Sequence, residues 1–196
     1  MRIAMLKIAL IVGSTRPDRF ADKVVAWFME TASMRSDMQI DIVDLRDQDL
    51  PFLEEPLSPA FTGGVFANPA AQKWCALVSV YDAYIATAAE YNHGPTAVLK
   101  NALDSAYLEW NRKPIAFLGY GGVGGARAIE QLRQVAIELQ MAPVKAEVNI
   151  AMEPFLGVLM QGRSLNDYPY LEAGRTAVLD QIQWWGDALK AARAKG

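Results

Sequence analysis

The chain has 196 residues, of which 52% are hydrophobic, and a formal net charge of -3. This length and apolar content fit a single domain over residues 1–196 with a sizeable core. The small net charge and the lack of a long lysine or arginine run argue against nucleic acid or an anionic membrane as partner. We therefore expect a small-molecule ligand.

Cysteine and histidine are scarce, since Cys75 and His93 are the single residues of their types. We therefore expect neither an internal disulfide nor a metal site built from soft ligands. A chain without disulfides fits the reducing cytoplasm, which we expect as its location. The apolar stretch near the N-terminus is too short to span a bilayer, and residues 1–6 are interpreted as a leader before the first strand.

The first clear pattern is a strand, a polar turn and a helix. Residues 8–12 are uniformly apolar, as in a strand covered on both faces of a parallel sheet, and apolar residues at helical spacing follow the turn at 13–19. The helix N-terminus, the Ser14 hydroxyl and the guanidinium of Arg16 or Arg19 favour a bound phosphate. An ordinary turn with solvated arginines is the alternative. The turn lacks the residues of an ATPase P-loop and the three glycines of a dinucleotide fold.

Further along the chain, strands alternate with helices. Strands are predicted at 39–45, 83–88, 114–120 and 143–150, helices at 70–80, 96–107, 126–140 and 170–194, and irregular segments at 46–69 and 151–169. Thr96 is expected to cap its helix. In the final helix, Val178, Ile182, Trp185 and Leu189 are expected to face the core.

Five strands that are each followed by a helix predict an α/β three-layer sandwich, with one parallel sheet between two layers of helices. A strand order of 2-1-3-4-5 would bring the loops at 13–20, 88–95 and 120–125 to one crevice at the carboxyl edge. Glycines at 121–125 allow close approach of a flat ring, and Tyr91 offers an aromatic wall. Phosphate and flat ring together suggest flavin mononucleotide (FMN), although the same residues could simply form turns.

Several short motifs resemble the NAD(P)H-dependent FMN reductase family of flavodoxin-like quinone and azo reductases. They are GSTRP at 13–17, EYNHGP at 90–95, LKNALD at 99–104, KP at 113–114, YGGVGG at 120–125 and RAIEQLR at 127–133. By this resemblance the fold is flavodoxin-like and the cofactor is FMN. The implied cofactor-binding residues are Ser14, Arg16, Arg19, Phe20 and Ala21 at the phosphate, Glu90, Tyr91, Asn92 and His93 beside the isoalloxazine, and Tyr120, Gly121, Gly122 and Gly125 at its other edge. Ala89 replaces a proline that is usual in the family, which leaves the flavin loop less restrained.

The resemblance implies a two-electron reductase in which NAD(P)H passes hydride to FMN and then gives way to a quinone, azo compound, flavin or similar acceptor. Such a ping-pong reaction needs no catalytic side chain, since the cofactor carries the chemistry. The choice between NADH and NADPH, the physiological acceptor and the role of His93, as proton donor or as part of the pocket wall, stay open.

The resemblance also implies a homodimer or homotetramer, which would give the apolar stretch at 50–66 a use. Two other functions are weighed against the reductase. A flavodoxin-type carrier would pass single electrons to a protein, but usually needs a strongly acidic docking face. A nucleotide-binding regulator would carry out no redox chemistry.

Overall fold

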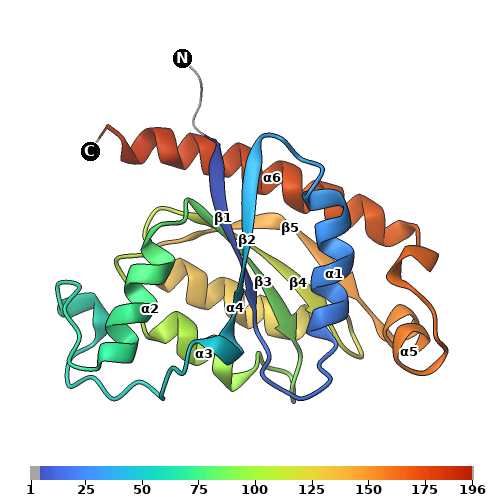
Figure 1. Ribbon diagram of the computed structural model, residues 1–196, viewed down its shortest axis with the longest axis horizontal. Helices are drawn as coiled ribbons and strands as arrows, with labels where there is room; N and C mark the ends of the chain where they lie inside the picture. The colour runs from blue at the N-terminus through green and yellow to red at the C-terminus, as the bar shows by residue number, and fades with distance from the viewer. Residues whose placement is uncertain (1–4, 196) are drawn as a thin grey trace.

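The computed structural model describes residues 5–195 and contains one five-stranded parallel sheet between two layers of helices (Figure 1). The strands lie in the order β2-β1-β3-β4-β5, which confirms the predicted order. Their bounds are β1 (Leu6–Val12), β2 (Met38–Asp44), β3 (Ala83–Ala89), β4 (Pro114–Tyr120) and β5 (Ala142–Ile150).

The helices form a layer on each face of the sheet. Helices α1 (Ala21–Ala32) and α6 (Tyr170–Arg193) cover one face, and α2 (Pro69–Ser79), α3 (Ala97–Asp104) and α4 (Ala126–Glu138) cover the other. Each face of the sheet therefore has its own hydrophobic core. Helix α5 (Met152–Met160) lies at the carboxyl edge, beside the loops (Figure 1).

Burial follows the sequence patterns closely. Every residue of β3 and β4 is buried, as their apolar runs predicted, whereas the edge strand β2 exposes Gln39 on one face and Ile42 on the other. Helix α3 begins as predicted, because the Thr96 hydroxyl oxygen accepts the Leu99 N–H at 3.2 Å. These elements fix the carboxyl edge at which the loops meet.

Helix α6 packs tightly across the sheet. Its 24 residues give it a length of about 36 Å, and it contacts β5, β4, β3 and β1. Gly186 allows this approach, since a Cβ there would lie 2.4 Å from Leu6 Cδ2. Leu6 is the first residue of β1 and not part of a leader, while residues 1–4 lie outside the described part of the chain.

The segment at 151–169 is not irregular as predicted. It forms α5 and a 3-10 helix at Leu165–Asp167, because Phe155 and Val158 pack on the core at helical spacing. Trp185 was predicted to face the core but is 39% exposed, because the neighbouring Gly186 is the residue that lies against Leu6 on the sheet. The helix predicted at 96–107 ends at Asp104, where the Ser105 hydroxyl donates to the Asn101 carbonyl.

Candidate functional site

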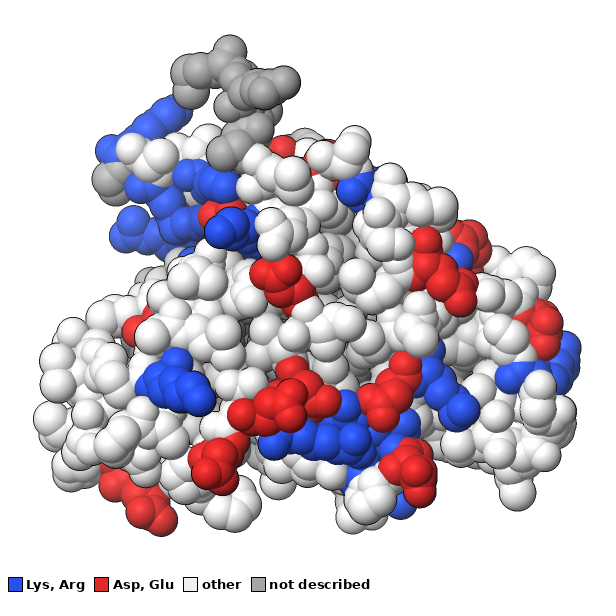
Figure 2. All heavy atoms as spheres, viewed as in Figure 1, with Lys and Arg blue, Asp and Glu red and all other residues white. Residues whose placement is uncertain are grey.

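A crevice of about 150 Å³ lies at the carboxyl edge, where the loops after β1, β3 and β4 meet. Figure 2 shows basic and acidic side chains intermingled along the lower edge of the view, where the loop after β1 lies. The predicted residues that line the crevice are Ser14, Arg16, Arg19, Phe20, Glu90, Tyr91, Tyr120 and Gly121. The predicted convergence of the three loops is therefore confirmed.

Five other predicted residues lie next to the crevice but not in its lining. Ala21 is the buried first residue of α1, and Gly125 is the buried N-cap of α4. Asn92 and His93 are exposed at the tip of the turn after β3, and Gly122 is exposed beside Met152. Backbone contacts from these positions to a ligand stay predictions.

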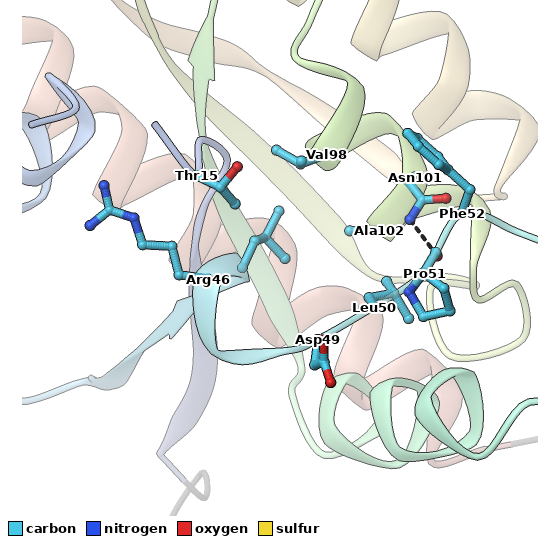
Figure 3. Close-up of a pocket in the computed structure, with 10 residues that line it drawn as sticks. Thr15, Arg46, Asp49, Leu50, Pro51, Phe52, Val98, Asn101 and Ala102 are labelled. Carbon is cyan, nitrogen blue, oxygen red and sulfur yellow. Dashed lines mark hydrogen bonds between the residues drawn. The ribbon is translucent and has the colours of Figure 1, made fainter. Parts of the chain in front are cut away.

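A larger cavity of about 480 Å³ lies between the loop at residues 13–20, named the phosphate loop after its predicted ligand, the segment after β2 and helix α3 (Figure 3). Thr15 and Val98 line it together with residues 49–52. Asn101 fixes the segment to α3, because its Nδ2 donates to the Pro51 carbonyl at 2.8 Å and its Oδ1 accepts the Leu53 N–H at 3.0 Å. The first part of the apolar stretch at 50–66 is thus anchored beside the phosphate loop.

The phosphate loop is fastened to the sheet at its first residue. The Gly13 N–H donates to Thr87 Oγ1 at 2.9 Å, and Thr96 Oγ1 donates to the Gly13 carbonyl at 2.5 Å. A Cβ at position 13 would lie 2.3 Å from the Thr87 carbonyl oxygen, so only glycine fits. Strand β3 and helix α3 therefore set the start of the loop before any ligand arrives.

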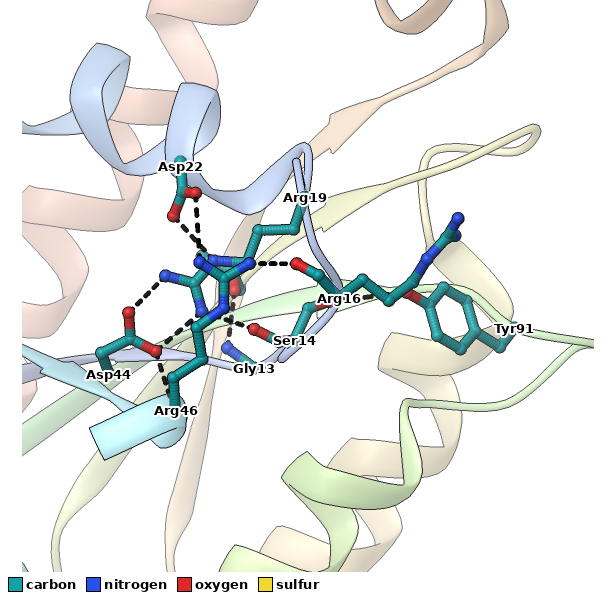
Figure 4. A network of polar contacts seen from close by, with 9 residues as sticks. Gly13, Ser14, Arg16, Arg19, Asp22, Asp44, Arg46 and Tyr91 are labelled. Atoms are coloured by element: carbon teal, nitrogen blue, oxygen red, sulfur yellow. Dashed lines mark hydrogen bonds and ion pairs between the residues drawn. The ribbon is translucent and has the colours of Figure 1, made fainter. Parts of the chain in front are cut away.

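The two arginines of the loop have different roles, which the sequence alone did not separate (Figure 4). Arg19 is 7% exposed and donates to both carboxylate oxygens of Asp44, to Asp22 Oδ1 at 2.7 Å and to the Ser14 carbonyl at 2.5 Å. Its hydrogen bonds to Asp44 hold the pKa of that carboxyl below its usual range. Arg19 thus lines the crevice but is used to shape the loop.

Arg16 is exposed, and its guanidinium carbon lies 5.8 Å from the centre of the Tyr91 ring (Figure 4). The buried Ser14 hydroxyl lies 3.5 Å from the Tyr91 hydroxyl. Among the described residues, no side chain caps the N-terminus of α1, which begins directly after this loop. A helix N-terminus without a side-chain cap, a hydroxyl and an exposed guanidinium fit a phosphate group.

The turn after β3 is held by helix α4. Residues 91–94 form a tight turn with two hydrogen bonds between Tyr91 and Gly94, and both central residues have positive φ, 51° at Asn92 and 71° at His93. At the base of the turn, Arg127 Nε donates to Glu90 Oε1 at 2.6 Å, and the Glu90 side chain is 4% exposed. This ion pair fixes the position from which the turn projects.

His93 is tied to the same helix. Arg127 Nη1 lies 2.8 Å from His93 Nε2, and Gln131 Nε2 donates to the His93 carbonyl at 2.6 Å. Because a guanidinium can only donate, Nε2 is the acceptor in this contact. His93 therefore serves to fasten the turn in this arrangement.

The glycine loop after β4 needs conformations that other residues avoid. Gly121 has a φ of 137°, and Gly125, at the N-terminus of α4, has a φ of 73°. A Cβ on Gly125 would lie 2.8 Å from both the Ala88 carbonyl oxygen and the Tyr120 nitrogen. The loop therefore passes close to the end of β3, where it can border a flat ring.

Phe155 and Leu159 of α5 also line the crevice, although neither was among the predicted site residues. The Phe155 ring centre lies 4.7 Å from that of Phe20 and 6.4 Å from that of Tyr120. Burial in this aromatic wall raises the pKa of the Tyr120 hydroxyl. The spacing of Phe155, Val158 and Leu159 is a helical signal that could have revealed α5.

Two further findings concern the described residues as a whole. Between residues 5 and 195, no three histidine, cysteine, aspartate or glutamate side chains gather as ligands for a metal ion. In the same range, no helix has the length and apolarity needed to cross a bilayer.

Comparison with known proteins places these features in a family. The family model described as NADPH-dependent FMN reductase matches residues 6–154. The NAD(P)H-dependent FMN reductase ntnL of Nectria sp is 36% identical over 148 residues, which cover 72% of this chain and 74% of that protein. A 2-hydroxy-1,4-benzoquinone reductase of Burkholderia sp is 32% identical over 143 residues, or 69% of this chain and 73% of that protein.

A solved structure shows the same fold. The flavoenzyme FerB, an NAD(P)H:(acceptor) oxidoreductase from Paracoccus denitrificans, superposes with a TM-score of 0.73 at 22% identity and covers 94% of this chain and 98% of its own. The fold is therefore flavodoxin-like, as predicted. Because the family model covers more than half of the chain, this protein belongs to the NADPH-dependent FMN reductase family.

Proposed function

We propose that the crevice holds FMN, with its phosphate at the N-terminus of α1 and its ring between the turn at 90–94 and the glycine loop at 120–125. The main support is the uncapped start of α1 beside the Ser14 hydroxyl and the exposed Arg16. Gly121 supports the ring position, because its positive φ favours glycine and a glycine has no Cβ to keep a ring away from the backbone.

The family uses FMN and NAD(P)H, and the bound flavin supplies two-electron transfer from the nicotinamide to an acceptor. The chain contributes position and electrostatics. Backbone N–H groups of the 90–94 and 120–125 segments would stabilise negative charge on the ring. Phe20, Tyr120 and Phe155 would exclude water from one side of the crevice.

We propose quinones as acceptors, so that NAD(P)H, a proton and a quinone yield NAD(P)⁺ and a hydroquinone. The support is the benzoquinone reductase among the relatives. Family membership favours this enzyme over a one-electron carrier or a regulator. We further propose that residues 1–196 work as one FMN-binding domain, and the cytoplasmic location, based on the single cysteine, stays a prediction.

We also propose that the chain self-associates through the stretch at 50–66. Phe52, Leu57, Phe61 and Val65 are 72%, 58%, 79% and 74% exposed. An apolar patch of this kind on a monomer marks a contact surface. The same stretch borders the cavity beside the phosphate loop, so that a second copy would lie near the cofactor.

The cofactor assignment is tested by titrating the apoprotein with FMN and then following NADH and NADPH oxidation with menadione as acceptor. We expect flavin absorbance in the purified complex and steady turnover with at least one nicotinamide. A colourless protein after FMN addition would refute the site, and flavin binding without nicotinamide oxidation would favour a carrier.

Self-association is tested by light scattering of the FMN-loaded protein at several concentrations. We expect a dimer or tetramer that Phe61→Ser weakens, whereas Trp184→Ser, at an exposed aromatic residue of α6, leaves the mass unchanged. A monomer at all concentrations, or equal effects of the two substitutions, would contradict the proposed contact.

A further inference from the structure

Helix α5 carries exposed apolar side chains, and only one of them, Leu159, also lines the proposed cofactor site. Met152, Leu159 and Met160 are 51%, 45% and 78% exposed. In the view of Figure 2, the surface over α5 is largely uncharged. The match to the family model ends at residue 154, within the first turn of α5, so it does not include Leu159 and Met160.

The exposed side chains of α5 continue the wall of the crevice. At the start of the helix, Met152 lies against the glycine loop, because a Cβ on Gly122 would be 3.4 Å from Met152 Cε. Near the other end, Leu159 lines the crevice together with the phosphate loop, and Met160 follows it on the exposed surface. An apolar strip of Met152, Leu159 and Met160 thus leads from the edge of the proposed ring site to solvent.

We propose that this strip binds the apolar tail of the acceptor, so that the preferred acceptors are quinones with an alkyl or prenyl chain. The inference rests on the proposed reduction of quinones. A quinone whose head reaches the ring must project its substituent out of the crevice, and α5 offers apolar surface at that exit. Methionine suits such a surface, since its unbranched, polarizable side chain adapts to chains of different shape.

The apolar strip could alternatively bind a second copy of this chain. The exposed residues of the stretch at 50–66 already form a separate patch for that contact. The strip on α5 differs from that patch, because Leu159 belongs to both the strip and the crevice lining. This continuity with the crevice favours the acceptor as occupant.

The test compares two benzoquinones with the same head group, one with a methyl and one with a decyl substituent, in NADPH-driven turnover of the FMN-loaded protein. We expect kcat/KM to be at least tenfold higher for the decyl compound. Met160→Gln should reduce this preference about fivefold and leave turnover of the methyl compound unchanged. That factor follows if about 40 Å² of apolar surface loses its burial at about 25 cal/mol per Å².

The double variant Leu159→Gln/Met160→Gln should reduce the preference further. Met34→Gln is the matched control, because Met34 is 75% exposed and follows α1 at the opposite edge of the sheet, and it should retain the full preference. Flavin absorbance and the melting temperature establish that each variant is folded and loaded.

Equal kcat/KM for the two quinones in the unmodified protein would overturn the inference, as would an unchanged preference in the double variant. A change in the mass of the double variant by light scattering would assign the strip to a subunit contact and would also overturn it. Turnover of neither quinone would instead contradict the proposed function, whereas turnover of both without preference contradicts only the role of α5.

Discussion

The different roles of the two arginines in the phosphate loop lead to a quantitative prediction. Arg19→Leu removes the partner of Asp44, whose side chain is 21% exposed and also accepts the Arg46 N–H. Breaking a fully buried ion pair costs about 3–5 kcal/mol, and the partial exposure of Asp44 reduces this to about 2–3 kcal/mol of unfolding free energy. Arg16→Leu, at an exposed position, should change stability by less than about 0.5 kcal/mol.

For FMN affinity, the order of the two effects should be reversed, with the larger loss in Arg16→Leu. Arg16→Leu removes charge-assisted hydrogen bonds worth about 1.5–3 kcal/mol, which corresponds to about a tenfold to hundredfold loss of affinity. Arg19→Leu should weaken FMN binding less and only by loosening the loop. Urea unfolding of the apoprotein and fluorescence titration with FMN measure the two quantities separately.

Acidification provides an independent check on Arg19. Because its hydrogen bonds lower the pKa of Asp44, the pair stabilises the fold above the usual aspartate pKa and loses this effect as pH falls below about 4. Arg19→Leu should therefore show a shallower loss of stability in acid. Equal stability of the two variants, together with a larger loss of FMN affinity in Arg19→Leu, would refute the division of roles.

Three more predictions follow from contacts around the site and in the core. Gly125→Ala should lower the free energy of unfolding by about 2–4 kcal/mol and weaken FMN binding, because it adds a backbone clash to the strain of a positive φ. Gly63 has a φ of 64° but open space around it, so Gly63→Ala should lower the unfolding free energy by only about 1 kcal/mol in the same urea experiment. Glu90→Gln should speed amide exchange in the 91–94 turn, because it weakens the ion pair with Arg127, and unchanged exchange would show that the turn is held by its own hydrogen bonds. Burial lowers the pKa of Lys113 from 10.5 to about 8, so between these pH values the unfolded chain binds a proton that the folded chain does not. The free energy of unfolding should therefore rise by about 2 kcal/mol from pH 8 to 10, and Lys113→Met should abolish this rise. The same pH dependence of the unfolding free energy in both proteins would contradict this.

The sheet and the convergence of its loops could be predicted because they depend on local patterns and a general topology rule. Apolar runs of strand length identify β3 and β4, and strand order then places the loops after β1, β3 and β4 together. These features need no knowledge of contacts distant in the sequence.

Other features could not be predicted, because they depend on partners far along the chain. Arg16 and Arg19 are equivalent in the sequence, and only the folded position of Asp44, 25 residues beyond Arg19, commits Arg19 to an ion pair. Helix α5 was missed because Pro154 and Gly157 weaken its pattern. Gly157 is required there by the Tyr168 hydroxyl, which would lie 1.9 Å from a Cβ.

The contacts of helix α6 with four strands have a consequence for folding during synthesis. Residues 170–193 contact β5, β4, β3 and β1, yet the ribosome synthesises them after all five strands. Until they emerge, one face of the sheet lacks much of its cover, including the contact between Gly186 and Leu6. The nascent chain therefore exposes apolar strands that chaperones would recognise, and folding is completed only when this helix docks.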